Sequence, residues 1–194
     1  MHVNKKTISY NNKKIIIYNQ LFDTRENLHI YNLIVNSNFQ RTNVDVPFYS
    51  NTDRDVKWIS YINPTSEISE IINSKYTKCI NDFLWSEISI IDQYINYGNN
   101  STVDFIHCDN YNLLSKNNNY TILHFANHTW NPNWHGNLLF FNDECTEIIQ
   151  GIVPTPGKVV IFDANLNHSA TPCNIKAEYP RYTIATKILY PILE

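Results

Sequence analysis

Apolar positions recur along the chain with two periods, one typical of helices and one typical of strands. Residues 13–18 are a short apolar run that predicts a strand, and Asp23-Thr-Arg-Glu26 is a capping-box pattern that opens a helix ending near residues 36–38. A second helix is predicted over about residues 66–85, where the apolar residues form one stripe at helical spacing. We interpret this stripe as the face of a helix that supports a sheet.

The rest of the chain alternates short apolar runs with polar turn segments. This pattern predicts strands over residues 58–62, 88–97, 103–109, 120–127, 137–142, 146–152, 158–163, 168–172 and 181–189. Helices followed by a run of short strands indicate an α+β fold, and such a run can close its edges as a double-sheet jelly roll. We therefore expect one domain over 1–194, with supporting helices and outer strands in 1–92 and a double-stranded β-helix (jelly-roll) core in 93–190.

Composition narrows the classes of function. The 194 residues are enough for one domain with a sizeable core, and a net charge of -3 gives no electrostatic footprint for nucleic acid. The apolar run 15–17 is far too short for a signal sequence or a membrane span, so we expect a cytoplasmic protein without a membrane partner. The four cysteines form no Cys-x-x-Cys pair, which favours reduced thiols.

Candidate metal chemistry is concentrated in Asp104-Phe-Ile-His107-Cys-Asp109. Side chains two residues apart on a strand share a face, so His107 and Asp109 can reach one metal ion together. A His-x-Asp pair alone is weak evidence, because many such pairs lie on solvated strands. His168, which follows another strand-like run, would complete two histidines and one carboxylate. Three such ligands with open coordination positions form the facial triad of non-haem Fe(II) oxygenases.

Further motifs follow the His-x-Asp pair in a fixed order. They are Tyr120-Thr-Ile-Leu-His-Phe-Ala-Asn127, Trp130-x3-Trp134-x-Gly-Asn-Leu138, Pro154-x-Pro-Gly-Lys-Val-Val-Ile-Phe-Asp163, His168-Ser-Ala-x-Pro172 and Arg181-Tyr-Thr-Ile-Ala185. This ordered set resembles the 2-oxoglutarate/Fe(II)-dependent dioxygenases, most closely the small single-domain members of the prolyl 4-hydroxylase-like branch. The resemblance covers about residues 94–189.

The resemblance implies a complete site. Fe(II) would be bound by His107, Asp109 and His168, with 2-oxoglutarate as co-substrate, O2 as oxidant and ascorbate as an auxiliary reductant. Arg181 would hold the distal carboxylate of 2-oxoglutarate, because its guanidinium binds carboxylates through two N–H groups. The other residues expected at the co-substrate are Thr183, Tyr97, Thr121, Leu123 and Phe125, and those expected at the substrate rim are Trp130, Trp134 and Lys187.

Two of these positions carry alternatives. Relatives often have tyrosine where Phe125 stands, so this chain would lack one hydrogen bond to the co-substrate. Lys187 can equally be a solvated lysine near the end of its strand. His124, His128 and His135 are predicted not to bind a metal, because His124 and His128 would lie two residue pairs apart on a strand.

The function that we expect is hydroxylation of an unactivated C–H bond, with release of succinate and CO2. A peptidyl proline is the substrate that the resemblance favours. The alternatives are a hydroxylase of a small molecule or sugar, a zinc-dependent hydrolase with the same three ligands, and a catalytically silent binding module. Asp109 argues against a halogenase, which needs that carboxylate to be missing. The expected partner is a peptide or a small-molecule substrate.

Overall fold

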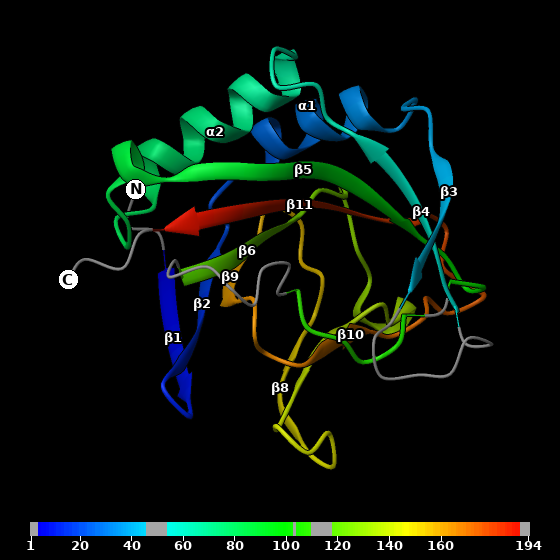
Figure 1. The fold of residues 1–194 in the computed structure, drawn as a ribbon. Helices are drawn as coiled ribbons and strands as arrows, with labels where there is room; N and C mark the ends of the chain where they lie inside the picture. Colours follow the sequence, from blue (N-terminus) through cyan, green and yellow to red (C-terminus); the bar gives the residue numbers. More distant parts are fainter. Residues whose placement is uncertain (1–3, 46–53, 103, 110–117, 191–194) are drawn as a thin grey trace.

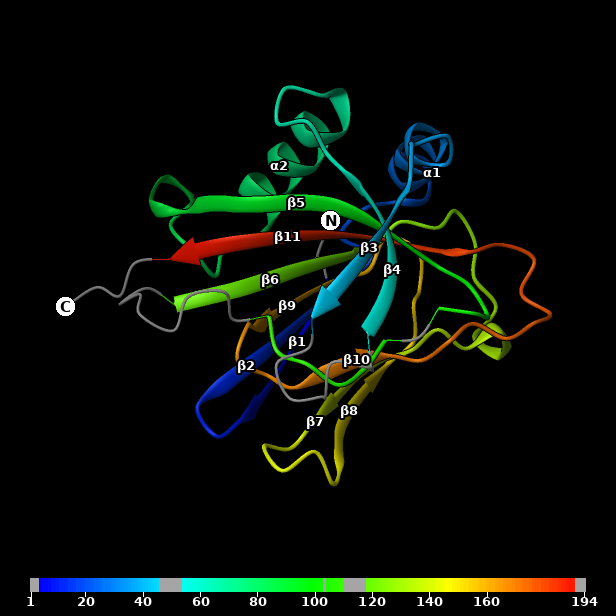
Figure 2. The same ribbon diagram turned by 45° about the vertical axis from the view of Figure 1, so that its right-hand side comes forward.

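A computed structural model describes residues 4–45, 54–102, 104–109 and 118–190 of the chain. Within these residues, strands form two sheets, and two α-helices pack on the outer face of the larger sheet (Figures 1 and 2). The smaller sheet lies against the opposite face (Figure 2). This arrangement confirms the α+β prediction with a jelly-roll core and supporting helices.

Every neighbouring pair of strands is antiparallel. The larger sheet has the order β1-β2-β9-β6-β11-β5-β4-β3, and the smaller sheet has the order β10-β7-β8. The strands are β1 (Asn4–Tyr10), β2 (Lys13–Asn19), β3 (Gln40–Asp45), β4 (Arg54–Tyr61), β5 (Ser89–Gly98), β6 (Asn118–Phe125), β7 (Leu138–Phe141), β8 (Ile148–Ile152), β9 (Val159–Asp163), β10 (His168–Ala170) and β11 (Arg181–Tyr190). Three strands from the second half of the chain, β9, β6 and β11, form the centre of the larger sheet, and strands from the first half flank them on both sides.

The central strands of the larger sheet are buried on both faces. On β2, Ile16 and Tyr18 belong to the core beneath the helices, whereas Ile15 and Ile17 belong to the core between the two sheets. Successive side chains of a strand point to opposite faces. A strand covered on both sides therefore reads as a continuous apolar run, which is why this segment could be predicted from the sequence.

The first helix begins where its cap pattern predicts. The Asp23 side chain accepts hydrogen bonds from the backbone N–H groups of Arg25 and Glu26, and the Glu26 carboxylate accepts one from the backbone of Asp23. The reciprocal bonds between Asp23 and Glu26 form the predicted capping box of α1 (Thr24–Ile34), and all three bonds satisfy N–H groups that have no partner within the helix.

The second helix, α2 (Glu67–Cys79), is shorter than its apolar stripe predicts. Its N-cap is Ser66, as expected, but the chain turns away after Cys79 and forms only a 3-10 turn at Trp85–Glu87. In the intervening segment, the Asp82 carboxylate accepts hydrogen bonds from Lys5 and Tyr18 of the β1–β2 hairpin. These long-range bonds hold the segment at the sheet edge and were not visible in the local pattern.

Two strand predictions need correction. The segment 104–109 is not a regular strand, and its strand-like pairing is the isolated bridge between His107 and His168; residue 103 lies outside the described residues. Conversely, β1 and β3 were not predicted. Both are edge strands of the larger sheet, and β1 is mostly exposed, so burial does not impose an alternating apolar pattern on its sequence. In the described part of the chain, neither helix is long and apolar enough to cross a membrane.

Candidate functional site

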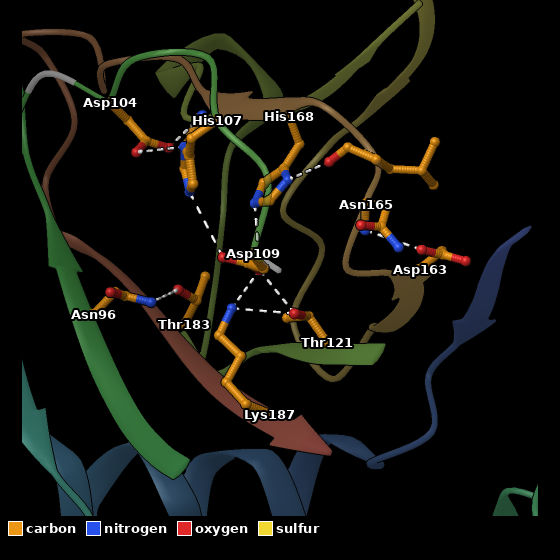
Figure 3. Close-up of polar contacts among 12 residues, drawn as sticks. Asn96, Asp104, His107, Asp109, Thr121, Asp163, Asn165, His168, Thr183 and Lys187 are labelled. Atoms are coloured by element: carbon orange, nitrogen blue, oxygen red, sulfur yellow. Dashed lines mark hydrogen bonds and ion pairs between the residues drawn. The ribbon is translucent and has the colours of Figure 1, made fainter. Parts of the chain in front are cut away.

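Backbone contacts between two distant segments assemble the three candidate metal ligands. His107 and His168 exchange two backbone hydrogen bonds, of 3.0 and 2.8 Å, and the Asp109 N–H donates to the Ala164 carbonyl at 2.8 Å. One ligand atom from each of His107, Asp109 and His168 lies within 4.8 Å of the others. The predicted triad thus converges without the predicted strand, because the backbone bridge to β10 places His107 beside His168 (Figure 3).

Hydrogen bonds to the backbone determine the tautomer of both histidines. Nδ1 of His107 donates to the Phe105 carbonyl at 2.8 Å, and Nδ1 of His168 donates to the Leu166 carbonyl at 2.9 Å. A carbonyl only accepts, so the proton of each neutral ring sits on Nδ1 and the lone pair on Nε2. Both Nε2 atoms approach Asp109, at 3.7 Å for His107 and 3.5 Å for His168. This tautomer is the one that a metal ion requires.

Asp109 is buried and ionised. Burial by itself would raise the pKa of its carboxyl, but the charge of Lys187, with smaller effects of His168 and His107, holds that pKa far below its usual range. Burial also lowers the pKa of His168, to about 4, so that this ring stays neutral near pH 7. Two imidazole nitrogens and one carboxylate suit a divalent transition metal.

A cavity extends from these ligands along the inner face of the larger sheet. Its walls include alternate residues of β11, Arg181, Thr183, Ala185 and Lys187, and alternate residues of β6, Thr121, Leu123 and Phe125. The register pairs Thr183 with Phe125, Ala185 with Leu123, and Lys187 with Thr121. Paired positions of antiparallel strands share a face, so both sets of side chains enter the same cavity.

Arg181 is a buried cation with unused hydrogen-bonding capacity. Its Nη1 donates to the Gly136 carbonyl at 2.7 Å, whereas its buried Nε has no hydrogen-bond partner among the described residues. Leaving a buried N–H of a charged group without a hydrogen bond lowers the stability of the fold. An anion that enters the cavity could accept this hydrogen bond, so the guanidinium is suited to bind one. The residues present therefore fit a metal ion at one end of the cavity and a carboxylate at the other.

Comparison with known proteins identifies the family. A family model described as the 2OG-Fe(II) oxygenase superfamily matches residues 93–188, the part of the chain that contains all three candidate ligands and Arg181. This part of the chain belongs to that superfamily. The chain is therefore a dioxygenase that uses Fe(II) and 2-oxoglutarate, and the predicted recognition, enzyme class and main cofactors are confirmed. A search of curated protein sequences found no match.

Solved structures of several oxygenases share the fold. A prolyl-4-hydroxylase from Pseudomonas putida matches with a TM-score of 0.65 and 13% identity, over 92% of this chain and 93% of that one. A prolyl hydroxylase from Trichoplax adhaerens, in complex with a hypoxia inducible factor peptide fragment, matches with a TM-score of 0.62 and 18% identity, over 91% and 82%. HygX from Streptomyces hygroscopicus, with nickel, 2-oxoglutarate and hygromycin B bound, matches with a TM-score of 0.62 and 12% identity, over 92% and 83%.

The side chains expected to contact the co-substrate differ in which face of the larger sheet they occupy. Thr121, Leu123, Phe125 and Thr183 line the cavity, in the register that period two predicts. Tyr97 pairs with Tyr182 on the helix-facing side of the sheet, where its ring packs against Phe39 and Tyr182. Part of Tyr97 nevertheless contributes to the lining of the cavity. On β5, the neighbours of Tyr97 that pair with cavity residues are Asn96 and Gly98.

Of the three residues expected at the substrate rim, Lys187 lines the cavity. Trp130 and Trp134 stack edge to face at 5.4 Å and are not among the described residues that line the cavity. An added Cβ at Gly136 would lie 3.2 Å from Trp130 and 3.4 Å from Arg181, so Trp130 and the arginine both approach this glycine. Lys187 is not a solvated strand-end lysine: it is buried, and its ammonium contacts Asp109.

Sequence reasoning missed a second ion pair beside the triad. The Lys57 ammonium lies 2.9 Å from the Asp104 carboxylate and 3.3 Å from Nε2 of His107. The other Asp104 oxygen accepts the backbone N–H of Ala170 at 2.7 Å. Burial opposes ionisation of Asp104, but the charge and hydrogen bond of Lys57, together with smaller effects of His107 and His168, outweigh it and lower the pKa to about 2. Asp104 lies three residues before His107 of the His-x-Asp pair and could have been suspected, whereas Lys57 precedes a predicted strand without any local signal.

Proposed function

We propose that the oxygenase hydroxylates an unactivated C–H bond, with Fe(II) bound by His107, Asp109 and His168 and with 2-oxoglutarate held by Arg181. One observation carries this proposal. A single cavity contains three converging ligand atoms and a buried guanidinium whose Nε lacks a partner among the described residues. A 2-oxoglutarate molecule has a metal-chelating end and a distal carboxylate, which match these two features.

Bound Fe(II) would supply the oxidation, in which O2 places one oxygen atom in the substrate C–H bond and the other in succinate while 2-oxoglutarate loses CO2. The chain positions and shields the reactants. The carbonyls of Phe105 and Leu166 orient the two imidazoles, and Arg181 orients the co-substrate. Leu123 and Phe125 give the cavity an apolar wall that excludes water.

The substrate class that we favour is a peptidyl proline. Two of the similar structures are prolyl hydroxylases, and one of them is in complex with a peptide fragment. Each likeness extends over more than nine tenths of this chain, so the whole fold, supporting helices included, is shared with them. Ascorbate would serve as an auxiliary reductant.

A small hydroxylated molecule is the second candidate. Polar groups of Lys57, Asn96, Thr102 and Asp104 line one side of the cavity and could bind sugar hydroxyls. HygX, which has a similar fold, is solved with hygromycin B. A zinc-dependent hydrolase is disfavoured, because the described residues of the cavity include no glutamate, and the pKa of Asp104, lowered to about 2, makes that carboxylate a weak general base.

The test is turnover with defined substrates. Purified protein is loaded anaerobically with Fe(II) or Zn(II), mixed with 2-oxoglutarate and O2, and assayed for succinate and for a gain of one oxygen atom by the substrate. We expect Fe(II)-dependent oxidation of proline-containing peptides. Oxidation of sugars but not of peptides would favour the second candidate. Hydrolysis with Zn(II), without succinate formation with Fe(II), would overturn the proposal.

A further inference from the structure

The two oxygens of the Asp109 carboxylate have different surroundings. Oδ2 accepts a hydrogen bond from the Thr121 hydroxyl at 2.7 Å and another from the Lys187 ammonium. Oδ1 accepts no hydrogen bond from the described residues, and its ion-pair contact is Nε2 of His107 at 3.7 Å. Oδ2 also lies 3.5 Å from Nε2 of His168, so each oxygen approaches one histidine, but only Oδ2 is held by hydrogen bonds from the described residues.

Lys187 and Thr121 form a closed triangle with this carboxylate (Figure 3). The two residues pair across β11 and β6, and the Lys187 ammonium also lies 3.1 Å from the Thr121 hydroxyl. Lys187 is only 4% exposed and Thr121 only 1%. Both groups thus come from central strands of the larger sheet, whose packing leaves them little freedom to move away from Asp109.

Asp109, Thr121 and Lys187 also lie between two cavities. Asp109, Thr121 and Lys187 line the main cavity and also a second cavity, which reaches Tyr120 and Leu189 towards the ends of β6 and β11. The carboxylate is thus held from the side that faces away from Arg181. Lys187 accordingly lies at the metal end of the site and does not serve as the partner of the distal carboxylate of 2-oxoglutarate.

We propose that Lys187 is a positioning residue, which together with Thr121 holds Oδ2 so that Asp109 offers the metal a single oxygen. The inference rests on the proposed role of Asp109 as a ligand. A carboxylate limited to one metal bond leaves a coordination position for co-substrate or O2. Outer hydrogen bonds of this kind orient ligating carboxylates in metal sites.

The direction of the change in metal affinity when Lys187 is removed distinguishes the positioning role from a purely electrostatic one. Lys187 carries a positive charge, so by electrostatics alone its removal would strengthen the binding of a second cation. If Lys187 positions Asp109, its removal instead weakens metal binding, because the carboxylate loses its fixed orientation. The two explanations predict opposite changes in metal affinity.

The experiment is an anaerobic titration of the full chain with Fe(II), repeated with Co(II), in four variants. For Lys187→Met we expect affinity to fall about 10–100-fold, the usual cost of losing an outer-sphere partner. Lys187→Arg keeps the charge and the donors and should retain most of the affinity. Thr121→Val should weaken binding while keeping the buried ion pair. Lys75→Met is the control: it removes a lysine whose carboxylate partner, Glu26, lies outside the cavity that contains the candidate ligands.

Co(II) absorption gives a second readout that does not depend on turnover. In Lys187→Met, the freed Oδ2 can also bind the metal, so the visible spectrum should change shape and 2-oxoglutarate should perturb it less. Unchanged or tighter metal binding, or an unchanged Co(II) spectrum, would overturn the inference. Asp109→Ala distinguishes failure of the proposed function from failure of this inference. If Asp109→Ala retains stoichiometric metal, the proposed triad is wrong. If Asp109→Ala loses the metal but Lys187→Met binds it with the affinity of the parent protein, only the positioning role of Lys187 is wrong.

Discussion

Gly98 and Arg181 lie opposite each other on β5 and β11, and the missing side chain of one makes room for the guanidinium of the other. A Cβ placed on Gly98 would lie 3.3 Å from Nη2 of Arg181, which is tighter than an ordinary contact. The conformation of the buried arginine therefore depends on a glycine that no metal or co-substrate motif would single out.

Gly98→Val should displace the Arg181 guanidinium and weaken 2-oxoglutarate binding. We expect about a tenfold loss, the lower end of what a charge-assisted hydrogen bond contributes. Fe(II) affinity should stay within about twofold of the parent, since the three metal ligands are untouched. Gly151→Val is the matched control, because an added Cβ there meets only Leu139, at 3.5 Å. Equal co-substrate affinity in both valine variants would show that Gly98 has no such role.

Arg181→Ala should raise the 2-oxoglutarate requirement about tenfold to a hundredfold, because it removes a charged hydrogen-bonding partner worth roughly 1.5–3 kcal/mol. Metal binding, measured in the absence of 2-oxoglutarate, should remain nearly intact. The measurement is the concentration dependence of succinate formation. An unchanged requirement would mean that another cation holds the distal carboxylate.

His107→Ala and His168→Ala should each abolish stoichiometric Fe(II) binding, because each removes one of three ligand atoms that lie within 4.8 Å of one another. Anaerobic titration of the parent protein should show one site per chain. His29→Ala, at an exposed position on α1, controls for the loss of a histidine elsewhere. Retention of tight, activity-supporting metal in both site variants would disprove the triad.

Phe125→Tyr tests the wall of the cavity next to Thr183, with which Phe125 pairs. If the added hydroxyl reaches the distal carboxylate, 2-oxoglutarate binding should tighten by one hydrogen bond, roughly 0.5–1.5 kcal/mol. Phe125 is 1% exposed and belongs to the core between the sheets. Weaker binding together with a lower unfolding temperature would instead mean that this space is already filled.

His124 should make the fold sensitive to acid. Its ring is fully buried, Nε2 bonds Asn27 at 2.7 Å, and burial lowers its pKa to about 3. An unfolded histidine has a pKa of about 6.5. Between these values the unfolded chain binds the additional proton, so stability is full above about pH 6.5 and falls by up to about 1.4 kcal/mol per pH unit as the pH drops towards 3.

The measurement is the free energy of unfolding in urea at several pH values. His124→Phe should be less stable than the parent near pH 7, because Asn27 loses its partner, but its stability should fall less steeply on acidification. Exposed His29 again provides the control, as His29→Gln. A parallel pH dependence in the parent and His124→Phe would assign the acid sensitivity to other groups.

The local pattern of the sequence determined features that depend on nearest neighbours. The capping box at Asp23 and Glu26 follows from hydrogen bonds within one turn, and the alternation over 120–127 places Thr121, Leu123 and Phe125 on one face. Both rest on short-range geometry that each segment carries by itself. The same holds for His107 and Asp109, whose spacing let them be proposed as ligands of one ion.

The tertiary structure alone decided which of these faces meet. His107 reaches His168 through a bridge between segments 61 residues apart in sequence, not through a strand of its own. The pairing of β5 with β11 places Tyr97 opposite Tyr182 and Gly98 opposite Arg181, and the same sheet brings Lys187 to Asp109. Register and long-range ion pairs depend on the packing of the whole sheet, because a shift of one residue reverses every side chain.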